Sequence, residues 1–250
     1  MYRDRRISLV IPARNEERLI RPTLEHIPDI IDKIYVIDDA STDLTAAIVE
    51  EFGKNDPRVN LIRLEKNMGP GGAIIRGYAE SSRKGYDISI VIGGDNQMSL
   101  DIISSFLDPI IDNECGYTKG NRFLSGFAIF YSMPPARLIG NCIFSLLTMV
   151  ASGYYRIFDF VNGYTAITKQ AIDTINWKNA WTQYGYPIDF LIRLNAYGFK
   201  VKDIPARAIY LKKEKQSQMK KCRYIVSVVP MLFRGFFWRL AKKYLYSSLS

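Results

Sequence analysis

The chain has 250 residues, of which 48% are hydrophobic and 24% charged; this ordinary balance excludes a wholly disordered protein and allows one sizeable α/β core. Its net charge of +9 comes from the C-terminal part, where ten Lys and Arg face one acid between Lys212 and Lys243. The single histidine, His26, excludes His-based triads and multi-histidine metal sites, and three scattered cysteines suit a reducing compartment better than a disulfide framework.

Strand-like apolar runs alternate with helix-like stretches through the first half of the chain. The expected strands are Ile7–Ile11, Lys33–Ile37, Val59–Leu64 and Ile88–Ile92. The expected helices are Glu16–His26, one capped by Ser41 or Thr42 that runs to about Phe52, and one around Gly72–Arg83. This alternation predicts right-handed βαβ units and an α/β fold with a mostly parallel sheet and flanking helices.

The fourth expected strand ends in an acid, because residues 88–97 read ISIVIGGDNQ. Open α/β sheets bind ligands just beyond the carboxyl ends of their strands. Asp95 is therefore well placed to hold a divalent metal on a ligand phosphate. Gly93, two residues earlier, occupies a position that could have carried a second acid.

The first two strands also end in polar residues, in VIPARNEE (residues 10–17) and VIDDASTD (residues 36–43). Asp38 or Asp39 can accept hydrogen bonds from a ribose or a base, while Ser41 shapes the turn into the next helix. The alternative is that DDAST is only a helix N-terminus whose acids favour the helix dipole.

A glycine-rich segment, NMGPGGAIIRGY, follows the third expected strand at residues 67–78. Glycines such as Gly69, Gly71 and Gly72 let a backbone approach a ligand closely. The segment is not a GxGxxG fingerprint after the first strand, and it lacks the GK[ST] ending of a P-loop. These differences exclude a dinucleotide-binding or P-loop ATPase interpretation.

Two later stretches are predicted to be amphipathic. Leu138–Tyr155 carries no charge, but Asn141, Ser145, Thr148 and Ser152 form a polar stripe, which fits a helix at an interface better than a membrane span. If Pro230–Tyr246 is helical, its large apolar residues share one arc and its cations point roughly the other way. The arc holds Leu232, Phe233, Phe236, Phe237, Leu240 and Tyr244, and the cations are Arg239, Lys242 and Lys243.

Such a basic, aromatic helix predicts a peripheral contact with an anionic membrane surface, and the alternative is a helix that caps the core. The chain accordingly divides into a domain over residues 1–215 and an amphipathic C-terminal helix within residues 216–250. No nucleic-acid-binding motif accompanies the basic tail, so nucleic acid is not an expected partner.

These segments together resemble the glycosyltransferase family 2, or GT-A, pattern of IPxxNEE, DDxSxD, NxGxGxA and an acidic strand end. Within that family the chain looks most like the polyprenyl-phosphate or dolichyl-phosphate sugar transferases. The added matches are GDNQ (residues 94–97), KGNRF (119–123), DFVNGY (159–164) and GFKVKDIPARAIY (198–210). The resemblance covers roughly residues 7–215, and it implies a GT-A fold, Rossmann-like with flanking helices.

The resemblance also implies roles for single residues. Pro12, Ala13, Glu16 and Asp38 match positions that line the nucleotide pocket, and the donor site is completed by Asp39, Ser41, Gly71 and Asp95. Asp95 and Gln97 match ligands of Mg²⁺ or Mn²⁺, although Gly93 departs from the family's DxDxQ. Asp159 matches the acid that faces the acceptor, and Arg122 and Arg137 are candidate cations for an acceptor phosphate.

The expected activity is therefore an inverting transfer of a hexose from a nucleotide sugar, of the GDP-mannose or UDP-glucose type, to a polyprenyl or dolichyl phosphate. Asp159 and Asp95 are the expected catalytic residues, and the expected location is cytoplasmic, peripheral on the inner face of the membrane. Two alternatives stay open. One is a family 2 transferase that acts on a glycan or another lipid, and the other is a catalytically silent nucleotide-sugar-binding protein. The sequence leaves the oligomeric state open.

Overall fold

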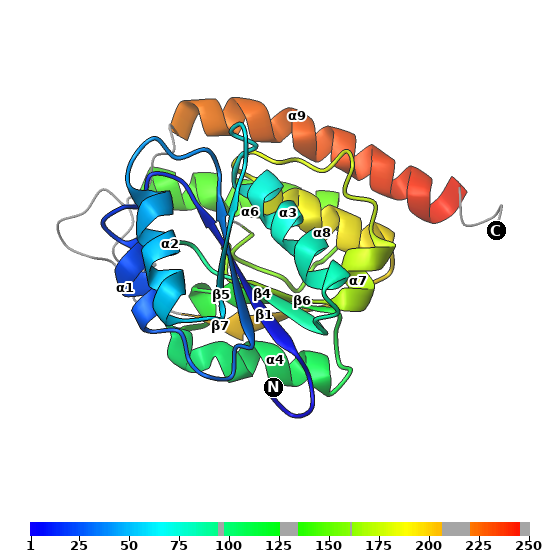
Figure 1. Cartoon of the computed structure of the whole chain (residues 1–250). Coiled ribbons are helices and arrows are strands. Elements are labelled where there is room, and N and C mark those ends of the chain that lie inside the picture. The colour runs from blue at the N-terminus through cyan, green and yellow to red at the C-terminus, as the bar shows by residue number, and fades with distance from the viewer. Residues whose placement is uncertain (95–97, 126–134, 161, 207–220, 246–250) are drawn as a thin grey trace.

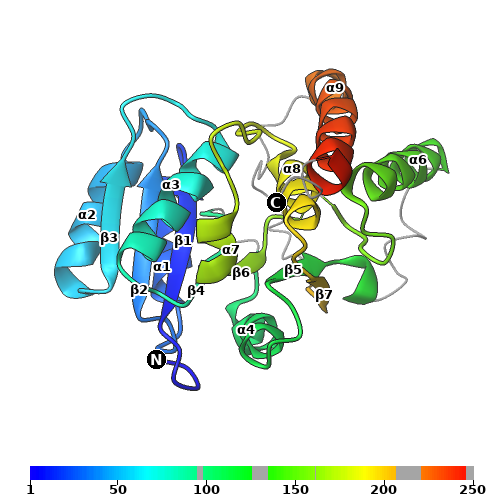
Figure 2. The ribbon, with the colours of Figure 1, turned by 90° about the vertical axis from the view of Figure 1, so that its right-hand side faces the viewer.

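The computed structural model describes residues 1–94, 98–125, 135–160, 162–206 and 221–245. Within these residues, seven strands form one sheet in the order β3-β2-β1-β4-β6-β5-β7, with helices on both faces (Figures 1 and 2). The strands are β1 (Ile7–Ala13), β2 (Lys33–Asp38), β3 (Val59–Arg63), β4 (Ile88–Val91), β5 (Tyr117–Asn121), β6 (Thr165–Thr168) and β7 (Val201–Pro205). The helices are α1 (Ile20–Glu25), α2 (Thr45–Asn55), α3 (Pro70–Arg83), α4 (Ile103–Ile111), α6 (Pro135–Ser152), α7 (Lys169–Thr174), α8 (Tyr186–Ala196) and α9 (Lys221–Leu240).

The sheet is mixed but mostly parallel. β1 pairs in parallel with β2 and β4, and β2 pairs in parallel with β3. β6 runs antiparallel to both of its neighbours, β4 and β5, and β5 pairs in parallel with β7. The carboxyl ends of β1, β2, β4, β5 and β7 therefore lie along one edge of the sheet, where ligands bind in folds of this kind.

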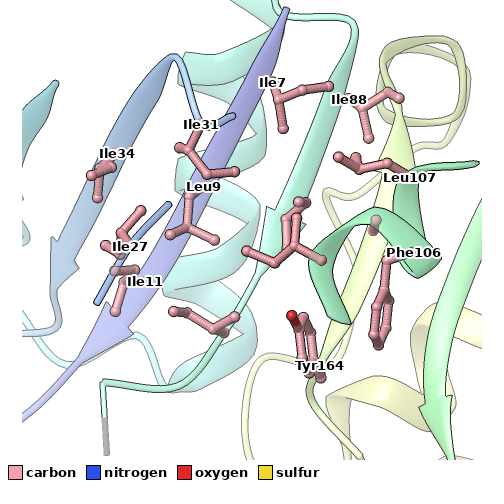
Figure 3. Packing of buried hydrophobic residues seen from close by; sticks show 14 of the residues in the cluster. Ile7, Leu9, Ile11, Ile27, Ile31, Ile34, Ile88, Phe106, Leu107 and Tyr164 are labelled. Atoms are coloured by element: carbon pink, nitrogen blue, oxygen red, sulfur yellow. The ribbon is translucent and has the colours of Figure 1, made fainter. Parts of the chain in front are cut away.

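Alternating side chains of β1 enter two separate cores. Ile7, Leu9 and Ile11 pack with residues of α1, α2 and α4, and in that layer the rings of Phe106 and Tyr164 stack with centroids 4.0 Å apart (Figure 3). Val10 belongs to the other layer, which is covered by α3, α7, α8 and α9. The two layers confirm the expected α/β class and bury the sheet on both faces.

The expected strands and the third helix are confirmed, but the first two helices begin later than the sequence suggested. α1 begins at Ile20 instead of near Glu16. The reason is that Asn15 has φ +54°, and the amides of Glu16 and Glu17 donate to the side chains of Thr45 and Asp43. The left-handed backbone at Asn15 and these bonds to the loop before α2 hold residues 15–17 in a turn, so the regular helix starts later.

Nor do Ser41 and Thr42 cap α2, which begins at Thr45. Asp43 supplies the local hydrogen bonds there, since its Oδ1 accepts from the amide (3.0 Å) and the hydroxyl (2.6 Å) of Thr45. The hydroxyl of Ser41 instead accepts a hydrogen bond from the amide of Asn15.

The two amphipathic stretches form α6 and α9, which lie side by side in both views (Figures 1 and 2). No helix within the described residues is both long enough and apolar enough for a membrane span. The expected arrangement of α9 is wrong in two places, because Leu232 and Arg239 are both buried against the protein.

Arg239 faces inward because α6 ends beneath it. The guanidinium donates to the carbonyls of Ala151 (3.0 Å) and Val150 (3.1 Å) and to the side chain of Asn195 (3.2 Å). The last carbonyls of a helix have no partner within it, and a cation at this end also meets the negative end of the helix dipole. A helical projection of α9 alone does not include the carbonyls of α6, so it could not predict that Arg239 faces inward.

Candidate active site

The loops after β1 and β2 are joined by hydrogen bonds at the carboxyl edge of the sheet. We call them the β1–β2 loops, residues 13–17 and 38–45. The amide of Asp39 donates to the carbonyl of Ala13 at 2.9 Å, and the amide of Asn15 donates to Oγ of Ser41 at 3.0 Å. Most of the predicted donor residues, from Ala13 to Ser41, therefore lie in one connected region.

Asp38 and Asp39 are adjacent, but their carboxylates have different surroundings. Asp39 accepts hydrogen bonds from the amides of Met68 (2.6 Å) and Gly69 (2.9 Å), so it fastens the glycine-rich segment to the end of β2. Within the described part of the chain, Oδ2 of Asp38 accepts no hydrogen bond, and Nε of Arg63 lies 3.7 Å away. Asp38 is thus the carboxylate of the two with bonding capacity left for a ligand.

The glycine-rich segment packs against protein at Gly71. A Cβ there would lie 2.7 Å from Cβ of Tyr186 and 2.9 Å from the carbonyl oxygen of Trp181, and the Gly71 amide donates to Thr182 at 2.8 Å. The hydroxyl of Tyr186 also lies against Gly163, in the DFVNGY segment. Gly71 therefore makes room for the chain before α8, and its contact with a donor stays a prediction.

The end of β4 reaches the same region. A Cβ at Gly94 would lie 3.5 Å from Cβ of Ala13 and 3.6 Å from Cγ of Glu16. Asp95 and Gln97, which follow, lie outside the described residues. The described residues contain no group of three His, Cys, Asp or Glu side chains that could hold a metal. The assignment of Asp95 and Gln97 as metal ligands stays a prediction.

Asp159 and Arg122 bind each other directly. The Asp159 carboxylate accepts hydrogen bonds from the Arg122 amide (2.9 Å), Nε (2.7 Å) and Nη2 (2.6 Å). The carboxylate is 1% exposed, whereas the arginine side chain is 30% exposed. Burial alone raises the pKa of Asp159, but the hydrogen bonds and charge of Arg122, with Lys119 nearby, outweigh it and lower the pKa, so the acid stays ionised.

A lysine and a second aspartate lie directly behind this pair. Nζ of Lys119 donates to the carbonyls of Gly120 (3.1 Å), Phe158 (2.9 Å) and Asp159 (2.5 Å), and burial lowers its pKa to about 8. Oδ1 of Asp203 lies 4.0 Å from the ammonium, and burial raises the pKa of that carboxyl.

The other oxygen of Asp203, Oδ2, accepts from Nδ2 of Asn121 (2.6 Å) and the amide of Phe158 (3.0 Å). We call Lys119, Asn121, Arg122, Asp159 and Asp203 the β5–β7 cluster. Sequence reasoning quoted the motifs that contain them but gave Lys119 and Asp203 no role. The structural signal is that Lys119 lies in the middle of β5, a strand whose residues are all buried.

Two predicted positions are less informative. Pro12 lies in β1, where it is paired with Ile37 of β2, and it is half-buried. Arg137 falls in the first turn of α6, and its side chain is outside the described ones. Their proposed contacts with donor and acceptor stay predictions.

The model of the family described as "Glycosyl transferase family 2" matches residues 8–175, which is well over half of the chain and includes β1 except Ile7 and all of β2 to β6. The chain belongs to glycosyltransferase family 2. The match covers the β1–β2 loops, the glycine-rich segment, Arg122 and Asp159. The family assignment makes the protein a glycosyltransferase and confirms the resemblance drawn from its motifs.

The names of two relatives refer to dolichyl phosphate or to a polyprenol phosphate sugar. A UDP-N-acetylglucosamine–dolichyl-phosphate N-acetylglucosaminyltransferase of Methanococcus voltae is 29% identical over 220 residues, covering 83% of this chain and 87% of its own. A polyprenol monophosphomannose synthase of Mycolicibacterium smegmatis is 26% identical over 217 residues, covering 80% and 76%. These matches confirm the expected relationship to polyprenyl-phosphate sugar transferases.

A solved structure with the same architecture is glucosyl-3-phosphoglycerate synthase of Mycobacterium tuberculosis, in complex with Mn²⁺, UDP-glucose and phosphoglyceric acid. The two chains superpose with a TM-score of 0.63 at 18% identity, over 92% of this chain and 80% of the other. At this identity the likeness establishes the fold alone, and it confirms the GT-A expectation.

Proposed function

We propose that the protein is an inverting transferase that moves a hexose from a nucleotide sugar, of the GDP-mannose or UDP-glucose type, to a polyprenyl or dolichyl phosphate. The observation that carries this proposal is the Arg122–Asp159 pair, which holds a partly exposed guanidinium at the strand edge. The guanidinium has five N–H donors, of which Asp159 takes the one on Nε and one on Nη2, and its positive charge suits a phosphate. Exposed Leu124 and Phe158, which flank the pair in sequence, suit an apolar chain attached to that phosphate.

The donor would lie at the β1–β2 loops, with Asp38 as the main hydrogen-bond acceptor for its nucleoside. Asp95 and Gln97 would hold a Mg²⁺ or Mn²⁺ ion on the diphosphate. One carboxylate, one amide oxygen and substrate phosphates form the oxygen-rich donor set that these ions prefer, so the loss of an acid at Gly93 does not exclude the site. When bound, such an ion stabilises the negative charge of the leaving diphosphate.

The acceptor would need little activation by the protein. A phosphate monoester has a second pKa of about 6, so it is largely a dianion near neutral pH. Its oxygen attacks the anomeric carbon as the bond from that carbon to the nucleoside diphosphate breaks, which inverts the configuration. Because the pKa of Asp159 is lowered, this acid is a weak base, and we assign it to orienting Arg122 and the acceptor phosphate.

The apolar side of α6 and α9 is proposed to rest on an anionic membrane surface, on the cytoplasmic side. Its exposed residues are Leu146, Leu147 and Val150 of α6 and Phe233 and Phe237 of α9, and they are joined by Tyr244 and Leu245 of the π-helical turn Ala241–Leu245 that follows α9. Exposed Arg234 and Lys243 accompany them, as is typical of helices at anionic interfaces. Co-sedimentation with vesicles of phosphatidylglycerol and phosphatidylcholine tests this, and it should fall strongly in Phe233→Ser/Phe237→Ser.

The inner side of α9 simultaneously fills the core through Val228, Met231 and Leu232. The inner side of α9 thus caps the core, and we propose a membrane contact for its outer side. The division into residues 1–215 and 216–250 stays a proposal about which part meets the membrane.

An acceptor assay tests the proposed activity. The protein is incubated with radiolabelled GDP-mannose, UDP-glucose or UDP-GlcNAc, with Mg²⁺ or Mn²⁺, and with undecaprenyl or dolichyl phosphate in detergent. Label in an acid-labile product in the organic phase is the expected result, and the unphosphorylated polyprenol is the matched control. Absence of such a product with every donor contradicts the proposal.

Two further arms of this assay separate the alternatives. Transfer to 3-phosphoglycerate, to a glycan or to a lipid without a phosphate monoester would indicate another family 2 activity. Calorimetric binding of UDP or GDP without turnover on any acceptor would indicate a silent nucleotide-sugar-binding protein.

A further inference from the structure

Lys119 and Asp203 are buried charged residues that the proposed chemistry does not use. The Lys119 side chain is almost completely buried, and an ammonium in such a place is costly unless its donors are satisfied. Its three N–H donors have three carbonyl partners, which belong to Gly120, Phe158 and Asp159. Two of these three carbonyls lie in the segment that presents the acceptor-side acid.

Asp203 holds the same segment from the next strand. Its Oδ2 accepts the amide of Phe158 at 3.0 Å, while Lys119 binds the carbonyl of that residue at 2.9 Å. The backbone of Phe158 is therefore held on both sides, by side chains that β5 and β7 carry on adjacent, hydrogen-bonded strands. Side chains from both strands therefore bind the backbone of the same residue, Phe158, in the loop after α6.

The backbone held in this way is one that needs support. Asp159 has φ +52°, a left-handed conformation that costs a non-glycine residue about 1 kcal/mol. Such a conformation persists only where the surroundings impose it. In this conformation the Asp159 carboxylate meets both the amide and the guanidinium of Arg122.

Direct pairing between Lys119 and Asp203 explains the arrangement less well. Their charged atoms are 4.0 Å apart, and Oδ1 of Asp203 accepts no hydrogen bond within the described residues. The shorter contacts of both side chains go to the Phe158–Asp159 backbone. We propose that Lys119 and Asp203 are positioning residues, which fix the Asp159 turn so that Asp159 aims Arg122 at the acceptor phosphate.

This inference rests on the proposed function for the identity of the acceptor. Its test is the variant Lys119→Met/Asp203→Asn, which removes both buried charges together and leaves neither one unpaired. We expect the KM for undecaprenyl phosphate to rise about ten-fold or more, equivalent to about 1.4 kcal/mol, while the KM for the sugar nucleotide stays within about two-fold. The affinity for undecaprenyl phosphate in detergent, measured without donor, should fall by a similar factor.

The matched control is Lys202→Met/Glu114→Gln. Lys202 is the neighbour of Asp203 on β7, and its ammonium pairs with Glu114 at 2.5 Å on the exposed surface. This double substitution also removes one lysine and one acid, but it does not touch the Asp159 turn. Both KM values and the acceptor affinity should stay at their wild-type levels.

Two results would overturn the inference. One is a wild-type acceptor KM in a folded Lys119→Met/Asp203→Asn protein, and the other is an equal rise of the donor and acceptor KM values. If that variant does not fold, Asp203→Asn keeps the shape of the side chain, and its acceptor KM should rise selectively by a smaller factor. An unchanged acceptor KM in folded Asp203→Asn counts equally against the role.

Failure of the proposed function would have a different signature, because the wild-type protein itself would neither glycosylate nor bind undecaprenyl phosphate. In that event a crystal structure of Lys119→Met/Asp203→Asn decides the positioning role. A turn in which Asp159 leaves the left-handed region and separates from Arg122 supports it, and an unchanged turn overturns it.

Discussion

The β1–β2 loops and the β5–β7 cluster lie on the same edge of the sheet, but they are stabilised in different ways. In the β1–β2 loops, backbone amides that follow β1 donate to the short side chains of Ser41, Asp43 and Thr45, which follow β2. In the β5–β7 cluster, buried charged side chains bind groups 37 to 84 residues away in sequence, as Asp159 and Lys119 do.

The difference suggests that the two halves of the site respond differently to substitution. A loop held by many separate amide bonds loses them one at a time, with modest effects on stability. A cluster of buried charges depends on each member, because removing one leaves another without a partner. We therefore expect the β5–β7 cluster to be the more sensitive half.

The largest effect is expected for Asp159→Asn. The substitution keeps the shape but removes the charge that holds Arg122 through three hydrogen bonds. Transfer to undecaprenyl phosphate should fall by about 10² or more, the loss expected when a positioned reactant is misplaced, while calorimetric UDP or GDP affinity stays unchanged. Asp173→Asn, at an exposed aspartate paired with Lys169, is the control. Equal losses of turnover in both variants would break the comparison.

Arg239→Met should give the largest loss of stability away from the site. It removes a buried cation from two carbonyls at the end of α6 and from Asn195, which should cost about 3 kcal/mol in the free energy of unfolding. Urea unfolding measures the change. Arg234→Met, at an exposed position of the same helix, should cost less than about 0.5 kcal/mol. Similar costs for the two arginines would contradict the inward orientation of Arg239.

A smaller effect is expected for Asp39→Asn in the β1–β2 loops. The substitution replaces one of two acceptor oxygens for the amides of Met68 and Gly69, so it should lower the free energy of unfolding by about 1–2 kcal/mol. Asp38→Asn, by contrast, should weaken UDP or GDP binding with little change in stability. A stability loss in Asp39→Asn and a binding loss in Asp38→Asn would support different roles for the two carboxylates. The same effect in both variants would contradict these roles.

The smallest effect concerns pH. Burial lowers the pKa of Lys119 to about 8 from 10.5, so between these values the unfolded chain binds more protons than the folded one. The contribution of Lys119 to stability therefore increases as pH rises through this window. Between pH 8 and 9 the wild type should gain on the order of 1 kcal/mol relative to Lys119→Met/Asp203→Asn. Urea unfolding at both pH values gives the difference, and an unchanged gap would contradict the buried ammonium.

The sequence predicted the β1–β2 half of the molecule well because its signals are local. Apolar runs bounded by turn residues located β1 to β4, and the polar strand ends located Asp38, Asp39 and Ser41. The start of α1 was missed because the amides of Glu16 and Glu17 are bonded to a loop about thirty residues away, which no local pattern encodes. Helix signals describe one segment at a time.

The β5–β7 half was predicted only as separate motifs. Family resemblance pointed to Asp159, and the need of a phosphate for cations pointed to Arg122, but neither indicated that the two residues bind each other. Lys119 and Asp203 are 84 residues apart, and only the parallel pairing of β5 with β7 brings them together. Arg239 was placed on the wrong side of α9, since a helical projection records charge and period but not the carbonyls of another helix.

The contact of Arg239 with α6 has a practical consequence for anyone trimming this protein. The basic C-terminal helix is an obvious segment to delete when weaker binding to membranes and surfaces is wanted. Deletion before α9 would leave the last carbonyls of α6 without their cation and would remove Val228, Met231 and Leu232 from the core. Variants with weaker surface binding are better obtained by replacing Phe233 and Phe237, whose side chains are exposed, than by shortening the chain.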